Sequence, residues 1–235
     1  MKSHDPLRGS NKKSERIIDK PRQIRMNMTK ILIIGNARDE KLSKWADLIG
    51  DSDVIIACDG AVNNCIEQGI SVDYLIGDMD SINREMLEKS NNSSSVKIVE
   101  ILDQDNNDLT KAILFAHGLE PEAIEIIGVD GGLSDHQFCN YLSLIECQTK
   151  ARIHLDDCTV SAITKGDARL YSIENGATFS LFSIGTSLGV NLSGSKWELK
   201  NSKLTPSSTG LHNIATSERL AVSCESGNLL LFINR

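Results

Sequence analysis

Long apolar runs are missing from this sequence, and their absence excludes a protein built on membrane-spanning helices. No stretch of its 235 residues approaches the roughly 18 to 20 apolar residues that such a helix needs, and no apolar secretory segment appears near residue 1. The chain is therefore expected to be a soluble globular protein, located in the cytoplasm and without a membrane partner.

Cysteine pairs at metal-ligand spacing are also missing. The six cysteines include no Cys-x-x-Cys pair, and the five histidines do not cluster with them. Several cysteines lie in apolar runs such as "VIIAC" at 54–58. They are expected to be small core residues in a reducing compartment, so neither disulfides nor structural zinc are expected.

Positive charge is scarce beyond residue 28. The chain has 25 Lys and Arg against 32 Asp and Glu, and residues 1–28 hold eight against three, so residues 29–235 hold 17 against 29. A nucleic-acid-binding domain usually carries a basic footprint, so no nucleic-acid partner is expected. Residues 1–28 are expected to be a disordered basic tail, and Met26 and Met28 leave a later start codon open.

From residue 29 onward, short apolar runs alternate with amphipathic stretches. Strands are expected at 31–34, 54–58, 73–77, 96–101, 123–127 and 151–155, and helices at 39–49, at 61–68, from near residue 82 and within 103–118. Continuous apolar strands separated by helices predict an α/β domain, a mostly parallel sheet with helices on both faces, over 29–156. Alternating patterns broken by Gly, Asn and Ser predict an all-β sandwich domain over 157–235.

Acidic residues follow four successive strands of the expected parallel sheet. They are Asp59, then Asp78 and Asp80, then the run "DQDNND" at 103–108, and then "DGGLSDH" at 130–136. Ligands bind outside the carboxyl ends of such strands, and clustered carboxylates repel unless a cation lies among them. Oxygen ligands suit Mg²⁺, so a magnesium site is predicted, although Asp is also common in turns and helix caps.

Phosphate-binding signatures are absent, since neither a Walker A sequence nor Gly-x-Gly-x-x-Gly occurs. The run "GVDGG" at 128–132 could shape a phosphate loop, but an ordinary turn is the simpler interpretation. Asp105 and Asp108 are expected on the first turn of the helix in 103–118, where carboxylates also favour the helix dipole. The residues alone leave three functions open: a magnesium-dependent transferase, a phosphatase or nucleotidyltransferase using Asp78 and Asp80, and a non-catalytic binder of a cationic metabolite.

The order of the motifs "DGAVN", "GDMDSI", "DQDNNDLTKA", "GGLSDH", "GSKWEL" and "LHN" resembles the thiamine pyrophosphokinase family across residues 30–235. The resemblance implies transfer of pyrophosphate from ATP to thiamine, giving thiamine diphosphate and AMP. It also implies Mg²⁺ as the cofactor and a homodimer with active sites between subunits.

The resemblance assigns roles to residues at matching positions. Catalytic and metal-binding roles fall on Asp78, Asp80 and Asp108, nucleotide binding on Asp59, Gln104, Asp105, Asp135 and His136, and thiamine binding on Trp197 and Asn213. An acidic pocket suits the cationic thiazolium, and Mg²⁺ would offset charge on the transferred phosphates. The chain departs from the family where Asn107 replaces Thr, Leu133 replaces Arg and His212 replaces Ser.

Overall fold

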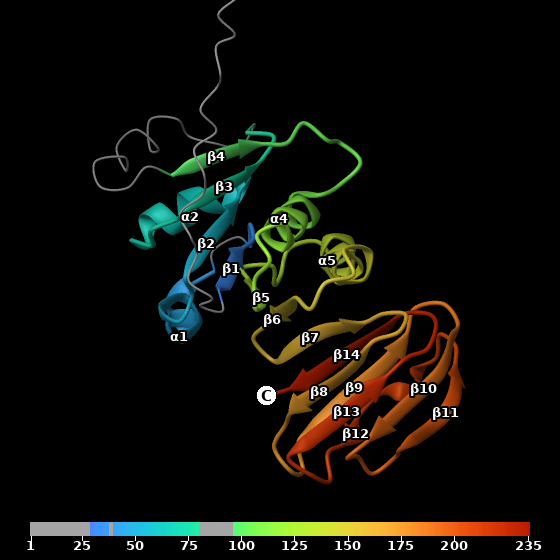
Figure 1. Ribbon diagram of the computed structural model, residues 1–235. Coiled ribbons are helices and arrows are strands. Elements are labelled where there is room, and N and C mark those ends of the chain that lie inside the picture. Colours follow the sequence, from blue (N-terminus) through green and yellow to red (C-terminus); the bar gives the residue numbers. More distant parts are fainter. Residues whose placement is uncertain (1–28, 38–39, 80–95) are drawn as a thin grey trace, which may run out of the picture.

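The computed structural model describes residues 29–37, 40–79 and 96–235. Its first half is a six-stranded parallel array with strand order β6-β5-β1-β2-β3-β4 (Figure 1). The strands are β1 (Lys30–Ile34), β2 (Val54–Cys58), β3 (Tyr74–Gly77), β4 (Lys97–Glu100), β5 (Ala123–Ile127) and β6 (Arg152–His154). The six expected strands are confirmed. The expected tail at 1–28 and the helix expected near residue 82 lie outside the described residues.

Helices cover both faces of this parallel array. One face carries α4 (Asp108–His117) and α5 (Ser134–Glu146), and the other carries η1 (Leu42–Trp45), α1 (Ala46–Gly50), η2 (Asp59–Ala61) and α2 (Val62–Glu67). Along β1, Ile31 and Ile33 belong to the core beneath α4, whereas Leu32 and Ile34 belong to the opposite core. Apolar residues at consecutive positions therefore mark a strand that is buried on both faces.

Two helix predictions need correction. The helix expected over 39–49 begins only at Leu42, as a 3-10 turn. The Glu40 carboxylate instead accepts a hydrogen bond from the Trp45 indole at 2.8 Å. Asp105 is not on the first turn of α4, because Asn107 caps that helix and Asp108 is its first residue.

The second half of the chain is a β-sandwich, as the alternating patterns predicted. Its elements are β7 (Cys158–Ile163), β8 (Ala168–Ser172), β9 (Thr178–Ser183), β10 (Ser187–Ser193), β11 (Leu199–Leu204), η3 (Ser208–Gly210), β12 (Asn213–Ile214), β13 (Arg219–Ser223) and β14 (Leu229–Asn234). The four-stranded sheet β11-β10-β13-β8 packs on strands β12, β9, β14 and β7. Phe179 and Leu231 from one sheet and Val190 and Leu220 from the other share this core.

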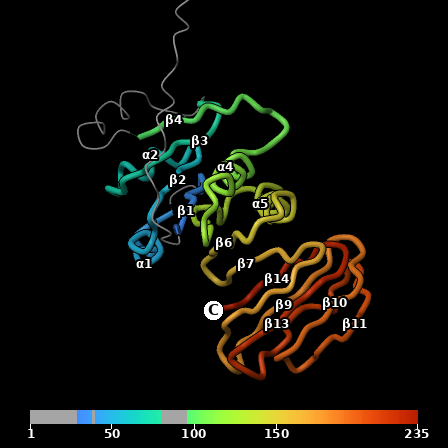
Figure 2. Tube along the Cα trace, viewed as in Figure 1, coloured from blue at the N-terminus to red at the C-terminus, as the bar shows by residue number. Residues whose placement is uncertain are grey.

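One sheet runs through both halves. Strand β7 pairs with β6 in antiparallel fashion, so the parallel array continues into the sandwich as a ten-stranded sheet, which Figure 2 lets the reader follow along the chain. The domain boundary near residue 156 stays a prediction. Within the described part of the chain, every helix is too short or too polar to cross a membrane.

Candidate active site

The carboxyl ends of the parallel strands bring the predicted acidic residues to one edge of the sheet. Asp59 follows β2, Asp78 follows β3, and Gln104 lies in the loop after β4. The register pairs Cys58 with Ile76, so Asp59 comes next to the end of β3. Neighbouring strands therefore place these side chains at the same edge.

Asp59 is held close against β3. Asp59 is only 1% exposed and is the first residue of η2. A Cβ atom added to Gly77 would lie 2.4 Å from the Asp59 Cβ atom, and one added to Gly60 would lie 2.0 Å from the Asn36 amide nitrogen. Glycine at these two positions therefore lets Asp59 and Asn36 approach the strand ends.

Asp78 is half-buried beside Gln104, whose amide nitrogen lies 3.5 Å from the Asp78 carboxylate. The chain turns sharply after Asp78, because Met79 has a φ of 66°, in the left-handed region that few non-glycine residues adopt. Asp80, predicted to share the metal with Asp78, lies outside the described residues.

The loop before α4 is organised around Asp103. Its carboxylate accepts hydrogen bonds from the Asn106 amide at 2.6 Å and from the Asp105 backbone N–H at 2.8 Å. These bonds hold the pKa of Asp103 below its usual range. Asp105 itself is exposed, and the loop delivers the chain to Asp108 at the start of α4.

Asp108 is paired with a buried cation. The Lys111 ammonium lies 3.1 Å from the Asp108 carboxylate, and Lys111 is 5% exposed, the only buried lysine or arginine in the described part of the chain. Cys58 lies within electrostatic reach of both charges. Burial and then the Asp108 charge raise the pKa of the Cys58 thiol, although Lys111 lowers it. Cys58 is therefore a neutral thiol and a poor nucleophile.

The donor chemistry at this edge suits a hard divalent cation. Within residues 29–37, 40–79 and 96–235, no three side chains of His, Cys, Asp or Glu are grouped closely enough to hold a metal ion. Mg²⁺ requires only one or two carboxylates where substrate phosphates and water complete its shell. Asp78 and Asp108 supply oxygen ligands of the required kind, so the described residues are compatible with Mg²⁺.

Asp135 and His136 are exposed on the first turn of α5. The Asp135 carboxylate accepts a hydrogen bond from the His136 backbone N–H at 2.9 Å. The preceding glycines, Gly131 and Gly132, have φ values of 78° and 77°, so "GVDGG" forms a turn that requires left-handed backbone. This turn leads the chain from the end of β5 to α5.

Trp197 and Asn213 lie together in the sandwich. The side-chain oxygen of Asn213 accepts a hydrogen bond from the Trp197 backbone N–H at 3.2 Å, and its nitrogen donates one to the Trp197 backbone carbonyl at 2.9 Å. Asn213 is buried, whereas Trp197 is 55% exposed. Both residues line a pocket of about 140 Å³ whose wall also includes Leu204, Thr209 and Leu211. Asn213 therefore holds the backbone of Trp197, and the indole is left accessible.

The strand order separates this pocket from the acidic residues. Asn213 lies on β12 and Asp78 follows β3, and eight strand intervals separate those two strands in the sheet. At roughly 4.8 Å per interval, this amounts to roughly 38 Å across the sheet. Within one chain, the structure therefore does not bring Trp197 and Asn213 to Asp78.

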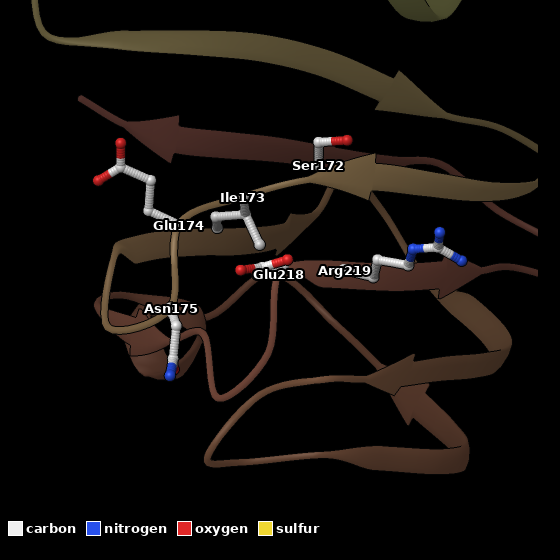
Figure 3. A pocket seen from close by; sticks show the side chains of 6 residues that line it. All are labelled: Ser172, Ile173, Glu174, Asn175, Glu218 and Arg219. Carbon is white, nitrogen blue, oxygen red and sulfur yellow. The ribbon is translucent and has the colours of Figure 1, made fainter.

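A second hollow, with a volume of about 650 Å³, lies in the sandwich where β8 ends and β13 begins (Figure 3). It is lined by Ser172, Ile173, Glu174, Asn175, Glu218 and Arg219. None of the predicted site residues lines it. In Figure 3 the side chains of Glu174, Asn175 and Arg219 point in different directions, so they do not converge on a common ligand position.

The sequence of this chain matches the family model described as thiamin pyrophosphokinase, catalytic domain, over residues 45–155. Thiamine pyrophosphokinase 1 of Arabidopsis thaliana is 31% identical over 167 residues, which cover 66% of this chain and 62% of the plant protein. These matches support the thiamine pyrophosphokinase family for this chain. It spans less than two thirds of the two Arabidopsis relatives, 62% and 54% of their lengths.

Solved structures with the same fold extend the similarity into the sandwich. Thiamine pyrophosphokinase from Bacillus subtilis superimposes with a TM-score of 0.71 at 22% identity, over 88% of this chain and 99% of the bacterial one. Thiamin pyrophosphokinase from Candida albicans gives a TM-score of 0.71 at 18% identity, over 88% of each chain. The α/β half followed by a sandwich is therefore the fold of the thiamine pyrophosphokinases.

The three departures from the thiamine pyrophosphokinase pattern lie at turns. Asn107 caps α4, Leu133 is 66% exposed just before α5, and His212 has a φ of 57° and donates its backbone N–H to the Ser180 hydroxyl at 3.1 Å. Two further residues of this edge, Asn36 and Lys111, were not predicted. The spacing of three residues between Asp108 and Lys111 could have signalled the ion pair, but not the burial of the lysine.

Proposed function

We propose that this chain is a thiamine pyrophosphokinase, which transfers the terminal pyrophosphoryl group of ATP to the hydroxyl of thiamine and releases AMP. The observation that carries the proposal is the row of carboxylates at the carboxyl edge of a parallel sheet, in a chain that matches the model of this family. Transfers of this kind depend on positioning and electrostatics more than on covalent chemistry.

Asp78, Asp80 and Asp108 are proposed to hold Mg²⁺, which would offset negative charge on the transferred phosphates. Gln104 is suited to orient Asp78, because its amide faces that carboxylate at 3.5 Å. Lys111 is suited to hold the Asp108 carboxylate in place, since the pair is 3.1 Å apart and the ammonium is buried. Asp78 and Asp108 thus each have a neighbour that limits the orientation of the carboxylate.

The nucleotide is proposed to bind along the same edge. Asp59, Gln104 and Asp105 lie on the loops after β2 and β4, and Asp135 and His136 lie on the first turn of α5. The residues at the start of α5, reached through the glycine turn, are exposed, and a helix N-terminus favours an anionic group such as phosphate. This arrangement supports ATP as the co-substrate.

Thiamine is proposed to bind between the two subunits of a homodimer, against Trp197 and Asn213 of one subunit and the carboxylates of the other. The wide separation of β12 and β3 in the sheet supports this arrangement, because Trp197 and Asn213 do not reach the carboxylates of their own chain. The accessible indole of Trp197 suits stacking on a planar cationic ring. A cytoplasmic location stays a prediction.

The test is an assay with ATP, Mg²⁺ and thiamine in which AMP is resolved from ADP. AMP should form only when thiamine is present. ADP as the product would indicate ordinary kinase chemistry instead, and phosphate trapped covalently on Asp78 would indicate a phosphatase. Binding of thiamine without nucleotide turnover would support a non-catalytic binder and would overturn the proposal.

A further inference from the structure

A buried serine hydroxyl connects α4 to α5. Ser143, on α5, is 1% exposed. Its hydroxyl accepts hydrogen bonds from the Thr110 hydroxyl at 2.8 Å and the Asn107 amide at 3.3 Å, and it donates one to the Cys139 carbonyl at 3.1 Å. A serine hydroxyl has one proton to donate and two lone pairs. The three bonds therefore use the whole hydrogen-bonding capacity of Ser143.

Both donors to Ser143 belong to the beginning of α4. Asn107 is the cap of this helix, and its carbonyl oxygen accepts the Thr110 backbone N–H at 2.7 Å. The same Asn107 side chain thus closes the first turn with its oxygen and reaches α5 with its nitrogen. Asp108 lies between these two anchors, as the first residue of α4.

The helix on the other side of the contact carries the nucleotide residues of the proposed site. Asp135 and His136 occupy the first turn of α5, two turns before Ser143 along the helix. The two helices lie side by side on one face of the sheet (Figure 1). A second contact joins them, between the Cys147 thiol and the Thr110 carbonyl at 3.9 Å.

We propose that Ser143 is a positioning residue for the phosphoryl-transfer site: it fixes the first turn of α4, and with it the Asp108 carboxylate, relative to α5. This inference rests on the proposed function for its catalytic consequence. Ser143 itself touches no substrate. Without its hydroxyl, the Thr110 hydroxyl and the Asn107 amide lose their acceptor in a buried site, which favours movement of the turn. A misplacement of about 1 Å can cost roughly 100-fold in rate.

The test compares Ser143→Ala with Ser143→Thr. For Ser143→Ala we expect kcat to fall roughly tenfold or more, the KM for thiamine to stay unchanged, and Mn²⁺ binding without nucleotide to weaken severalfold. Amide hydrogen exchange at Thr110 should accelerate, because its N–H depends on the cap. Ser143→Thr should recover these properties, since a helical threonine hydroxyl can bond the carbonyl four residues back.

Ser187→Ala is the matched control. Ser187 is fully buried in the sandwich and its hydroxyl bonds Ser183 at 2.7 Å and the Asn228 carbonyl at 3.2 Å, so its loss should lower Tm comparably and leave kcat unchanged. If Ser143→Ala does not fold, Thr110→Val, which removes one donor at nearly constant volume, should give the same kcat and exchange effects.

Two outcomes would overturn the inference: a Ser143→Ala protein with wild-type kcat, Mn²⁺ affinity and Thr110 exchange, or one whose losses match those of Ser187→Ala. Amide hydrogen exchange at Thr110 and Mn²⁺ affinity test the positioning role of Ser143 without requiring enzymatic turnover. A wild-type protein that forms no AMP would therefore refute the proposed function alone.

Discussion

Lys111 and Asp108 form an ion pair in which the cation is buried and the carboxylate is partly exposed, with side-chain exposed fractions of 5% and 41%. Breaking such a pair from one side leaves a buried charge without compensation. Replacing the Asp108 carboxylate should therefore cost stability as well as activity.

Asp78→Asn and Asp108→Asn should each lower kcat by roughly 100-fold or more, because each removes a proposed metal ligand. Asp108→Asn should also lower the free energy of unfolding, by about 1 to 2 kcal/mol once solvent screening of the exposed carboxylate is considered. Urea unfolding and thermal melts would measure this. The double variant Asp108→Asn/Lys111→Met should recover the stability without the activity, and an Asp108→Asn protein as stable as wild type would contradict the argument.

Substitution of Gly77 is expected to lower both stability and activity. Its added Cβ atom would lie 2.4 Å from the Asp59 Cβ atom, so Gly77→Ala must displace β3 or η2. We expect about 1 to 3 kcal/mol of destabilisation and a large loss of activity. Gly50→Ala at the end of α1, where nothing lies within 4 Å, is the matched control and should keep or slightly raise Tm. Equal behaviour of both variants would argue against the close packing.

Asn107 and Lys111 show which features of the site the sequence does not predict. The run "DQDNND" offers several residues that can cap a helix, and the choice of Asn107 depends on its additional bond to Ser143, which lies 36 positions away. Lys111 resembles an exposed partner of Asp108 at helical spacing, and only the packing of α4 on β2 and β3 reveals that it is buried. Local patterns therefore located the acidic residues but not their partners.

At the scale of elements, the strands were predictable because apolar runs at consecutive positions are sufficient to identify strands buried on both faces. The junction between β5 and β6 carries a feature that no such run shows. Glu125, 6% exposed on β5, accepts hydrogen bonds from the Arg152 guanidinium at 3.1 Å and contacts the His154 ring at 2.6 Å. Burial alone would raise the pKa of Glu125, but these bonds and charges outweigh burial and hold its pKa below its usual range.

The sign of this shift gives a pH prediction. A carboxyl group whose folded pKa is depressed stabilises the fold above its unfolded pKa, and this contribution is lost as pH falls through the folded pKa. Glu125→Gln should therefore be less stable than wild type at pH 7, and the difference should shrink below about pH 4.5. Unfolding in urea across pH 3 to 7 would measure it. The exposed Glu146→Gln is the control, and a difference for Glu125→Gln that is independent of pH would contradict the assignment.

At the scale of the whole molecule, strand order decides which residues a single chain can bring together in one site. No local pattern contains that order, so the sequence could not show that β12 and β3 lie far apart in one sheet. Mixing Asp108→Asn chains with Trp197→Ala chains tests the proposed shared site. Random pairing makes about half of the dimers mixed, each with one intact site, so about a quarter of all sites should recover.

Activity after subunit exchange is the measurement, and native mass spectrometry establishes that exchange took place. Each parent protein should be a poor enzyme alone. Mixed dimers that form but regain no activity would place Asp108 and Trp197 in the same subunit's site, or would remove Trp197 from the site.

The position of β14 has a consequence for how the chain is made. Residues 229–234 form the last strand in chain order, yet they pair with both β7 and β9 in the interior of the ten-stranded sheet. During translation, strands β1 to β6 can associate early, whereas β7 and β9 wait with unpaired backbone edges until β14 leaves the ribosome. Exposed strand edges recruit other chains. Nascent chains stalled before residue 229 should therefore be the aggregation-prone species, and chaperones that bind them should dissociate when β14 enters the sheet.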